Sequence, residues 1–301
     1  MKNELNRRSL TALVAGVVLT LSISIPAFAH GGGTNGTPQG PVNMFSGVLV
    51  APAAGRGPGA HDSMWITDLW VRGEVGDVVT LEFHQMDAGS SDPTATASLT
   101  LTQPVVYLPD VLQKEFGLDG GFGNIVIRSN GGHGISGTIR TFDASENGTY
   151  GSAFMAMPSN MGMGSYGGMM DDDREEHRMY VQGLLPQPQA RVNVVVTNPG
   201  DQKIEGTLEV IDADGGDPAT GAKSFPFTIE GYSAHQFNDV LAGVHSRFGN
   251  DAGLQLMVEL QDGTPGMMMV LASVVDNQTN DAYTVMGNMM WSGGMGGGMM
   301  P

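Results

Sequence analysis

The feature of this sequence that most constrains its fold is an internal repeat. The segment Leu108–Leu112 recurs as Phe237–Leu241, and the segment Ile139–Tyr150 recurs as Ala272–Tyr283. The two pairs are separated by almost the same distance along the chain, which indicates that one structural unit is present twice. Each copy has room for about 115 residues, which is enough for a hydrophobic core of its own.

Each copy has the two-residue alternation of strands that bury one face. Apolar residues alternate with polar ones over 79–84 in the first copy and over 204–210 in the second. Strands with this pattern have one buried and one solvated side, so we expect Glu82 and His84 to lie on a solvated side. Many such segments, separated by Gly, Pro, Asn and Asp turns, are typical of a β-sandwich.

Helical segments are short and occur once in each copy. The first is Asp110–Phe116, which Gly117 ends, and the second is Asp239–Phe248, which follows a capping Asn238. The predicted fold class is therefore all-β, with two tandem immunoglobulin-like β-sandwiches that each carry one short helical turn.

The amino-terminal residues have the pattern of a secretory signal peptide. A basic start is followed by an apolar run and by the small-residue cleavage pattern Ala27–Ala29. The pair Arg7-Arg8 also resembles a twin-arginine signal, and the general secretory route is the favoured alternative. We expect an exported protein, periplasmic or extracellular, with no membrane span after cleavage. The predicted segments are a signal peptide at 1–29, a flexible Gly-rich segment at 30–43, sandwich modules at 44–158 and 178–290, a Met/Gly and acidic linker at 159–177, and a Gly/Met-rich tail at 291–301.

Composition excludes several classes of function. The chain has 31 acidic and 14 basic side chains, a formal net charge of −17, and no cysteine. This charge argues against a nucleic-acid partner, and the lack of cysteine excludes disulfide scaffolds and thiolate metal sites. The sequence contains no nucleophile elbow, zinc-protease motif, phosphate-binding loop or dinucleotide fingerprint, so we predict that the protein is not an enzyme.

Several segments resemble a pattern found in uncharacterised bacterial secreted proteins. They are Trp65–Trp70, Asp110–Leu112, Gly148–Gly151 and, most clearly, Ala272–Thr279. The resemblance covers most of residues 44–290 and implies tandem immunoglobulin-like sandwich modules and export, without implying an activity. The usual second module opens with Arg-Thr-Asn, which the chain matches only in part at Arg191–Asn193.

Methionine is the compositional outlier and suggests a copper site. Of 21 methionines, most lie in three short segments, two of which are rich in glycine. Thioethers are soft ligands that select Cu(I), and a mixed Met, His and carboxylate segment suits a copper-binding protein. The candidate metal ligands are Met161, Met163, Met169, Met170, His177, Met179, Met289, Met290, Met295, Met299, Met300 and His30. The alternatives are that these segments are linkers or adaptable contact surfaces, and that Met267–Met269 belongs to the core.

An amino-terminal histidine offers a second route to copper. Cleavage after Ala29 would make His30 the first residue, whose amine and imidazole could form a histidine brace with a second histidine, as in copper monooxygenases. The candidates for that second ligand are His61, His84 and His133. Against this, the glycines after His30 do not provide the rigid support that such a site needs.

The sequence therefore leaves three functions open. The leading hypothesis is a non-enzymatic exported protein that binds a protein or glycan, or serves a structural role, at the cell surface or in the periplasm. The second hypothesis is a periplasmic copper-binding protein or chaperone that uses the methionine clusters. The third is a histidine-brace copper oxidase.

Overall fold

The computed structural model describes ten stretches of the chain. They are residues 47–59, 63–131, 133–145, 151–159, 178–184, 190–212, 217–249, 251–264, 267–277 and 282–288. The predicted signal peptide, the Gly-rich segment, the tail and all but Ser159 of the predicted linker lie outside these stretches. Residues Asn43–Pro301 form one compact unit.

Strands account for most of the described chain. The first half contains β1 (Val48–Pro58), β2 (Met64–Arg72), β3 (Val78–Gln85), β4 (Ala95–Thr100), β5 (Val105–Leu108), α1 (Val111–Lys114), β6 (Gly121–Ser129), β7 (Ser136–Asp143), β8 (Gly151–Met155) and β9 (Met157–Pro158). The second half contains β10 (Arg178–Val181), β11 (Ala190–Thr197), β12 (Ile204–Asp212), β13 (Ser224–Ile229), β14 (Ala234–Phe237), a 3₁₀ helix (Asp251–Gly253), β15 (Leu254–Leu260), β16 (Met269–Asp276) and β17 (Ala282–Met286).

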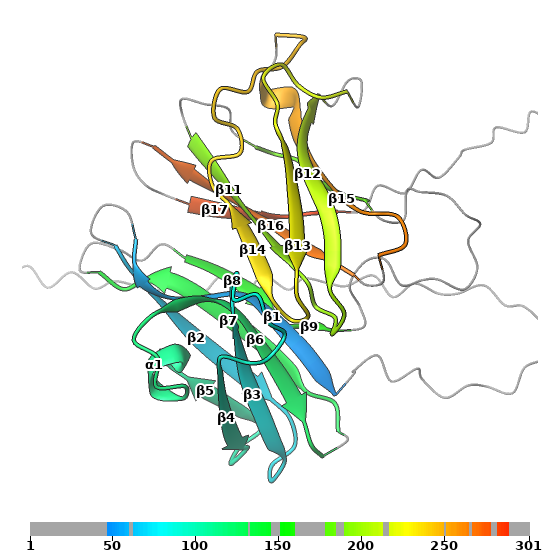
Figure 1. The fold of residues 1–301 in the computed structure, drawn as a ribbon. Helices are drawn as coiled ribbons and strands as arrows, with labels where there is room; N and C mark the ends of the chain where they lie inside the picture. Colours follow the sequence, from blue (N-terminus) through cyan, green and yellow to red (C-terminus); the bar gives the residue numbers. More distant parts are fainter. Residues whose placement is uncertain are drawn as a thin grey trace, which may run out of the picture. The chain divides into compact units, whose positions relative to one another are not determined.

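The strands of the first half form a sandwich around one core (Figure 1). One layer has the strand order β4-β3-β6-β1, and the other has the order β5-β2-β7-β8. β1 links the layers, because it pairs with β6 along most of its length and with β2 at Gly57 and Pro58. Leu69, Leu81 and Ile127 are fully buried between the layers, where the removal of apolar surface from water stabilises the sandwich.

The strands of the second half repeat this arrangement. Their two sheets have the orders β13-β12-β15-β10 and β14-β11-β16-β17, around a second core that includes Val194, Leu208 and Val258. Taken in chain order, β1–β8 of the first half have counterparts at the same places in β10–β17, and β9 has no counterpart among the described strands. The all-β sandwich prediction is confirmed, and the repeat in sequence is matched by a repeat in strand order.

The repeated Asp-Val-Leu segment has the same backbone conformation in both halves. Asp110 and Asp239 both have positive φ, at 45° and 47°. The amide of Asp110 donates to Asp68 Oδ1 over 3.0 Å, and the amide of Asp239 donates to Asn193 Oδ1 over 3.0 Å. Asp and Asn tolerate this left-handed conformation better than most residues. These two hydrogen bonds show that Asp68 of β2 and Asn193 of β11 occupy equivalent positions in the two halves.

The strand order departs from the immunoglobulin arrangement at the outer strands. Both orders place the second strand beside the fifth and the third strand beside the sixth. In this chain the fourth strand pairs with the third and the seventh pairs with the second, whereas in an immunoglobulin constant domain the fourth pairs with the fifth and the seventh with the sixth.

The predicted helix over 239–248 is absent. Val240 and Leu241 begin a series of turns, and the left-handed Gly243 (φ 71°) prevents a continuous helix. Leu241 and Val244 instead reach into the second core. The predicted first helix is present and shorter than expected, and Gly117 follows it with φ 68°.

The two sandwiches contact each other mainly through one sheet of each, and also where β8 meets β17, with Ser152 Oγ 2.6 Å from Thr284 Oγ1. Val50 of β1 and Val126 of β6 alternate with core residues and pack outside the core with Met269 of β16. Beside them, Asn124 Nδ2 donates to the carbonyl oxygen of Tyr232 over 3.0 Å. This contact, which we call the internal junction, joins the outer face of β4-β3-β6-β1 to that of β14-β11-β16-β17.

Candidate functional site

The candidate site lies on the outer face of the β5-β2-β7-β8 sheet. Along β2, Leu69 and Val71 are fully buried in the core, and the two-residue alternation places Trp70 and Arg72 on the outer side. The neighbouring strands add outward residues at the same level. We call this surface the aromatic face, defined by Trp70, Arg72, Val105, Tyr107, Thr138 and Arg140.

Two stacked rings form the centre of the aromatic face. Trp70 and Tyr107 are direct cross-strand partners, and their ring centroids lie 4.9 Å apart with planes inclined by 24°. Tyr107 Oη donates to Asp68 Oδ2 over 2.9 Å, and this hydrogen bond raises the pKa of the Tyr107 phenol above its usual range. Asp68 is buried and also accepts the Asp110 amide, so the stack has a fixed orientation.

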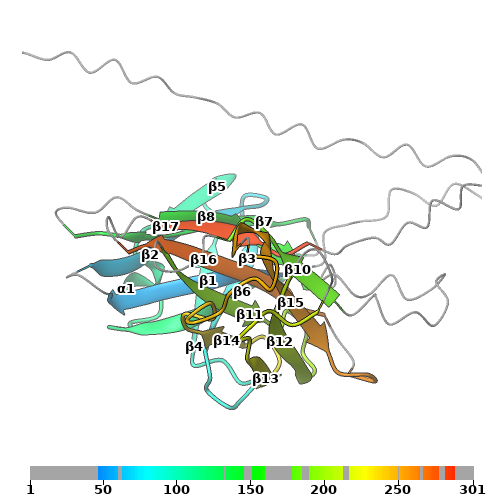
Figure 2. The ribbon, with the colours of Figure 1, turned by 90° about the horizontal axis from the view of Figure 1, so that it is seen from above.

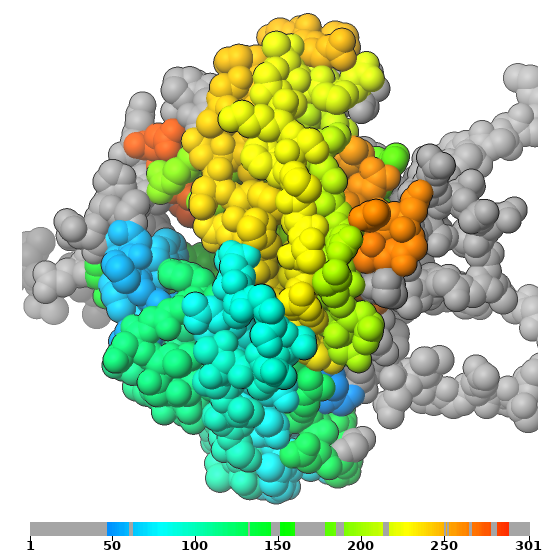
Figure 3. Space-filling view, in the orientation of Figure 1, coloured from blue at the N-terminus to red at the C-terminus, as the bar shows by residue number. Residues whose placement is uncertain are grey.

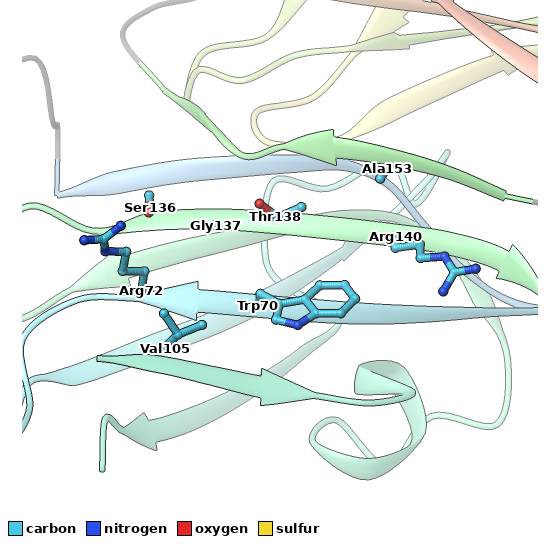
Figure 4. A pocket seen from close by; sticks show the side chains of 8 residues that line it. All are labelled: Trp70, Arg72, Val105, Ser136, Gly137, Thr138, Arg140 and Ala153. Atoms are coloured by element: carbon cyan, nitrogen blue, oxygen red, sulfur yellow. The ribbon is translucent and has the colours of Figure 1, made fainter. Parts of the chain in front are cut away.

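Two arginines flank the stack. Figure 4 shows Trp70 between Arg72 and Arg140, beside a hollow lined by residues of β2, β5, β7 and β8. The Arg140 guanidinium lies 4.3 Å from the centroid of the Phe142 ring. Neither arginine forms a salt bridge with any residue that the structure describes.

Unpaired arginines are unusual in a chain with such an excess of acid. Arg56 pairs with Asp110, Arg128 with Glu82, Arg178 with Glu259 and Arg247 with Asp217, at N···O distances of 2.7–3.2 Å. Arg72 and Arg140 therefore have guanidinium groups with no carboxylate partner among the described residues, and their planar donors suit carboxylates. The aromatic face can bind a partner by burying its rings and pairing its two positive charges.

His84 is buried, so the prediction of a solvated position was wrong. Its side chain is 1% exposed, with the ring centroid 5.5 Å from that of Tyr232 in the other sandwich. Nε2 lies 3.5 Å from Glu82 Oε2, and Nδ1 has no hydrogen-bond partner among the described residues. Burial lowers the pKa of His84 below its usual range. The alternation correctly gives the side of the strand, and the second sandwich covers that side.

Among the other candidate brace histidines, the structure describes only His133. His133 is half-exposed, and its Nδ1 lies 3.0 Å from Asp77 Oδ1. The hydrogen bond with Asp77 raises the pKa of this histidine. His30 and His61 lie outside the described residues. Within the described stretches, no group of three His, Asp or Glu side chains could hold a metal ion.

The candidate methionine ligands fall almost entirely outside the described residues. This holds for Met161, Met163, Met169, Met170, His177, Met289, Met290, Met295, Met299 and Met300. Met179 is described, and it is 2% exposed within the second core. This is the position of a packing residue, and Met179 takes no part in the site proposed below. Met267–Met269 is buried: Met268 lies in the second core, as the core alternative predicted, whereas Met269 lies in the internal junction.

The sequence patterns do not point to the aromatic face. Trp70 belongs to one of the segments that carry the family resemblance, and no motif singles out Tyr107 or Arg140. A signal was present, because the alternation of β2 places Trp70 on the same side as Asp68 and Arg72, and a large aromatic among charged residues suggests a contact surface. The stacking partners come from strands far apart in sequence, which spacing alone does not reveal.

Comparisons with protein-family models, with curated proteins and with solved structures found no match to this chain. Within the described residues, no helix has the length and apolar character needed to span a membrane.

Proposed function

We propose that this protein is an exported, non-enzymatic binding protein that holds an acidic protein partner on its aromatic face. The observation that carries the proposal is the stacked Trp70–Tyr107 pair between the unpaired Arg72 and Arg140. Tryptophan, tyrosine and arginine are the residues that most often dominate binding energy at protein interfaces. The signal-peptide pattern of residues 1–29 supports export.

The second sandwich favours a protein over a glycan as the partner. Its β14-β11-β16-β17 sheet corresponds to the sheet of the aromatic face, and a protein surface, the first sandwich, already covers it. In addition, Trp70 and Tyr107 each cover one ring face of the other. The pair therefore suits burial against side chains better than it suits a flat platform for a sugar ring.

The proposal is tested by retention on immobilised poly-L-glutamate, with polygalacturonate and dextran as comparison matrices. We expect wild-type protein to be retained on poly-L-glutamate at low salt and R72Q/R140Q to elute early, because charge pairing at an exposed surface weakens with salt and requires both charges. The control K114Q/K223Q removes two exposed positive charges elsewhere and should be retained like wild type.

Equal retention of wild type and R72Q/R140Q would contradict the role of the aromatic face. Retention on polygalacturonate without retention on poly-L-glutamate would replace the protein partner with an acidic glycan.

A further inference from the structure

The internal junction uses one sheet face of each sandwich, and among the described residues the other two outer faces have no partner sheet. The open faces are the aromatic face of the first sandwich and the outer face of β13-β12-β15-β10 in the second. The aromatic face is formed by strands that correspond to β14-β11-β16-β17, and the open face of the second sandwich is formed by strands that correspond to β4-β3-β6-β1. The two open faces are therefore equivalent to the two faces that the internal junction joins. We infer that the partner of the aromatic face is the open face of a second copy, so that chains join head to tail by repeating the internal junction. This inference rests on the proposed function.

Register identifies which residues of the second sandwich take the places of the junction residues. In the first sandwich, Val126 of β6 lies opposite both Val50 and Glu82. In the second sandwich, Met257 of β15 lies opposite both Tyr180 and Glu209. Met257 and Tyr180 therefore occupy the places of the buried valines and form a partly exposed apolar centre on the outer face of this sheet, whereas Gln255, next to them on the same face, is buried.

Carboxylates surround this apolar centre. We call the surface the acidic face, defined by Tyr180, Glu205, Thr207, Glu209, Met257 and Glu259. Glu205 pairs with Lys203 over 2.6 Å and Glu259 pairs with Arg178 over 2.7 Å, whereas Glu209 has no salt bridge to a described residue. In Figures 1 and 2, β13, β12 and β15 lie side by side, and in Figure 3 the atoms of β12 and β13 lie uncovered at the surface.

The aromatic face has charges that complement the acidic face. Aligning Asp68 with Asn193 places Arg72 where the second sandwich has Thr197. In the internal junction, Thr197 Oγ1 donates to Asn124 Oδ1 over 3.4 Å. The counterpart of Asn124 in the acidic face is Gln255 of β15, the strand beside Glu209. In a repeated junction, the Arg72 side chain would lie next to Gln255. Its guanidinium would then be near the carboxylate of Glu209, which has no salt bridge to a described residue.

An interface between two different faces does not close by two-fold symmetry. An open assembly keeps one free face at each end, so it grows past two chains, as a ring where the rotation between chains closes and as a helical array where it does not. Because the charges lie at exposed surfaces, the association should weaken steeply as the ionic strength rises.

The test is sedimentation velocity and light scattering of the purified chain over a range of concentrations and salt. We expect the weight-average mass of wild type to rise with concentration past that of two chains at low salt and to fall toward one chain at high salt. The control K114Q, which removes an exposed positive charge outside both faces, should behave like wild type. Thermal melting monitored by circular dichroism should show that every variant is folded.

Two variants that each block one face make the test specific for head-to-tail contact. R72Q/R140Q lacks the charges of the aromatic face, and E205K/E209K reverses two charges of the acidic face. We expect each variant alone to remain a single chain, and an equimolar mixture to form a one-to-one dimer that grows no further.

Three results would overturn the inference: wild type that stays a single chain at every concentration, R72Q/R140Q that assembles like wild type, or E205K/E209K that still forms dimers through the aromatic face alone. Retention on poly-L-glutamate separates this failure from that of the proposed function. If retention still requires Arg72 and Arg140 while wild type stays a single chain, the aromatic face binds a different acidic protein. If retention does not require them, the proposed function fails as well.

Discussion

At the scale of single residues, His84 makes the stability of the fold sensitive to acid. Burial lowers its folded-state pKa below the ordinary value of 6.5, although Glu82 opposes this shift and Arg128 adds to it. The unfolded chain therefore binds the proton more readily, and the free energy of unfolding should decrease as the pH falls through 6.5 toward the folded pKa. Denaturant unfolding between pH 8 and 5 measures this slope, which should be shallower in His84→Gln. An unchanged slope in that variant would contradict the prediction.

Trp70 is the single side chain that we expect to contribute most to binding. Trp70→Ala should weaken association by about 2 kcal/mol, roughly thirtyfold, because a buried tryptophan at the centre of an interface is a typical hot spot. The dissociation constant from sedimentation equilibrium measures the effect. Phe248→Ala removes another exposed aromatic, 61% accessible and outside both open faces, and should leave the constant unchanged. Comparable losses in both variants would mean that general hydrophobicity, not the aromatic face, drives association.

At the scale of elements, Gly123 is required for the pairing of β6 with β3. A Cβ atom at this position would lie 2.0 Å from the carbonyl oxygen of His84, which is backbone and cannot move aside cheaply. Gly123→Ala should therefore lower the free energy of unfolding by about 1–3 kcal/mol. At Gly253 an added Cβ meets no atom within 4 Å, so Gly253→Ala should change stability little. Chemical denaturation of both variants measures the free energy of unfolding. Equal values for the two variants would show that β6 can move away from β3 without loss of stability.

At the scale of elements, some features of the fold follow from local sequence patterns and others depend on tertiary contacts. Alternation and turn residues are local, so the strands, the repeat and the core position of Met268 follow from the sequence alone. The absent helix over 239–248 depends on a left-handed Gly243 and on the docking of Leu241 and Val244 into the core, which is tertiary. The aromatic face depends on which strands become neighbours, and sequence spacing does not fix that order.

At the scale of the whole molecule, Val126 and Met257 are a matched pair of positions. Val126 is fully buried in the internal junction, and Met257 occupies the same place on the open acidic face. A charge at Val126 would be buried without a partner, so Val126→Glu should lower stability by about 3 kcal/mol or more and resolve the unfolding of the two sandwiches into separate transitions. Scanning calorimetry measures both effects.

Met257→Glu should leave the stability of the chain unchanged and prevent association, because we infer that the acidic face is covered only when another chain binds. We expect a melting profile close to that of wild type in dilute solution and a loss of the concentration-dependent rise in mass. The two variants together test whether one kind of face serves both inside the chain and between chains. If Met257→Glu unfolds like Val126→Glu, the acidic face is already covered within the chain. If it assembles like wild type, the repeated junction is not the contact that joins the copies.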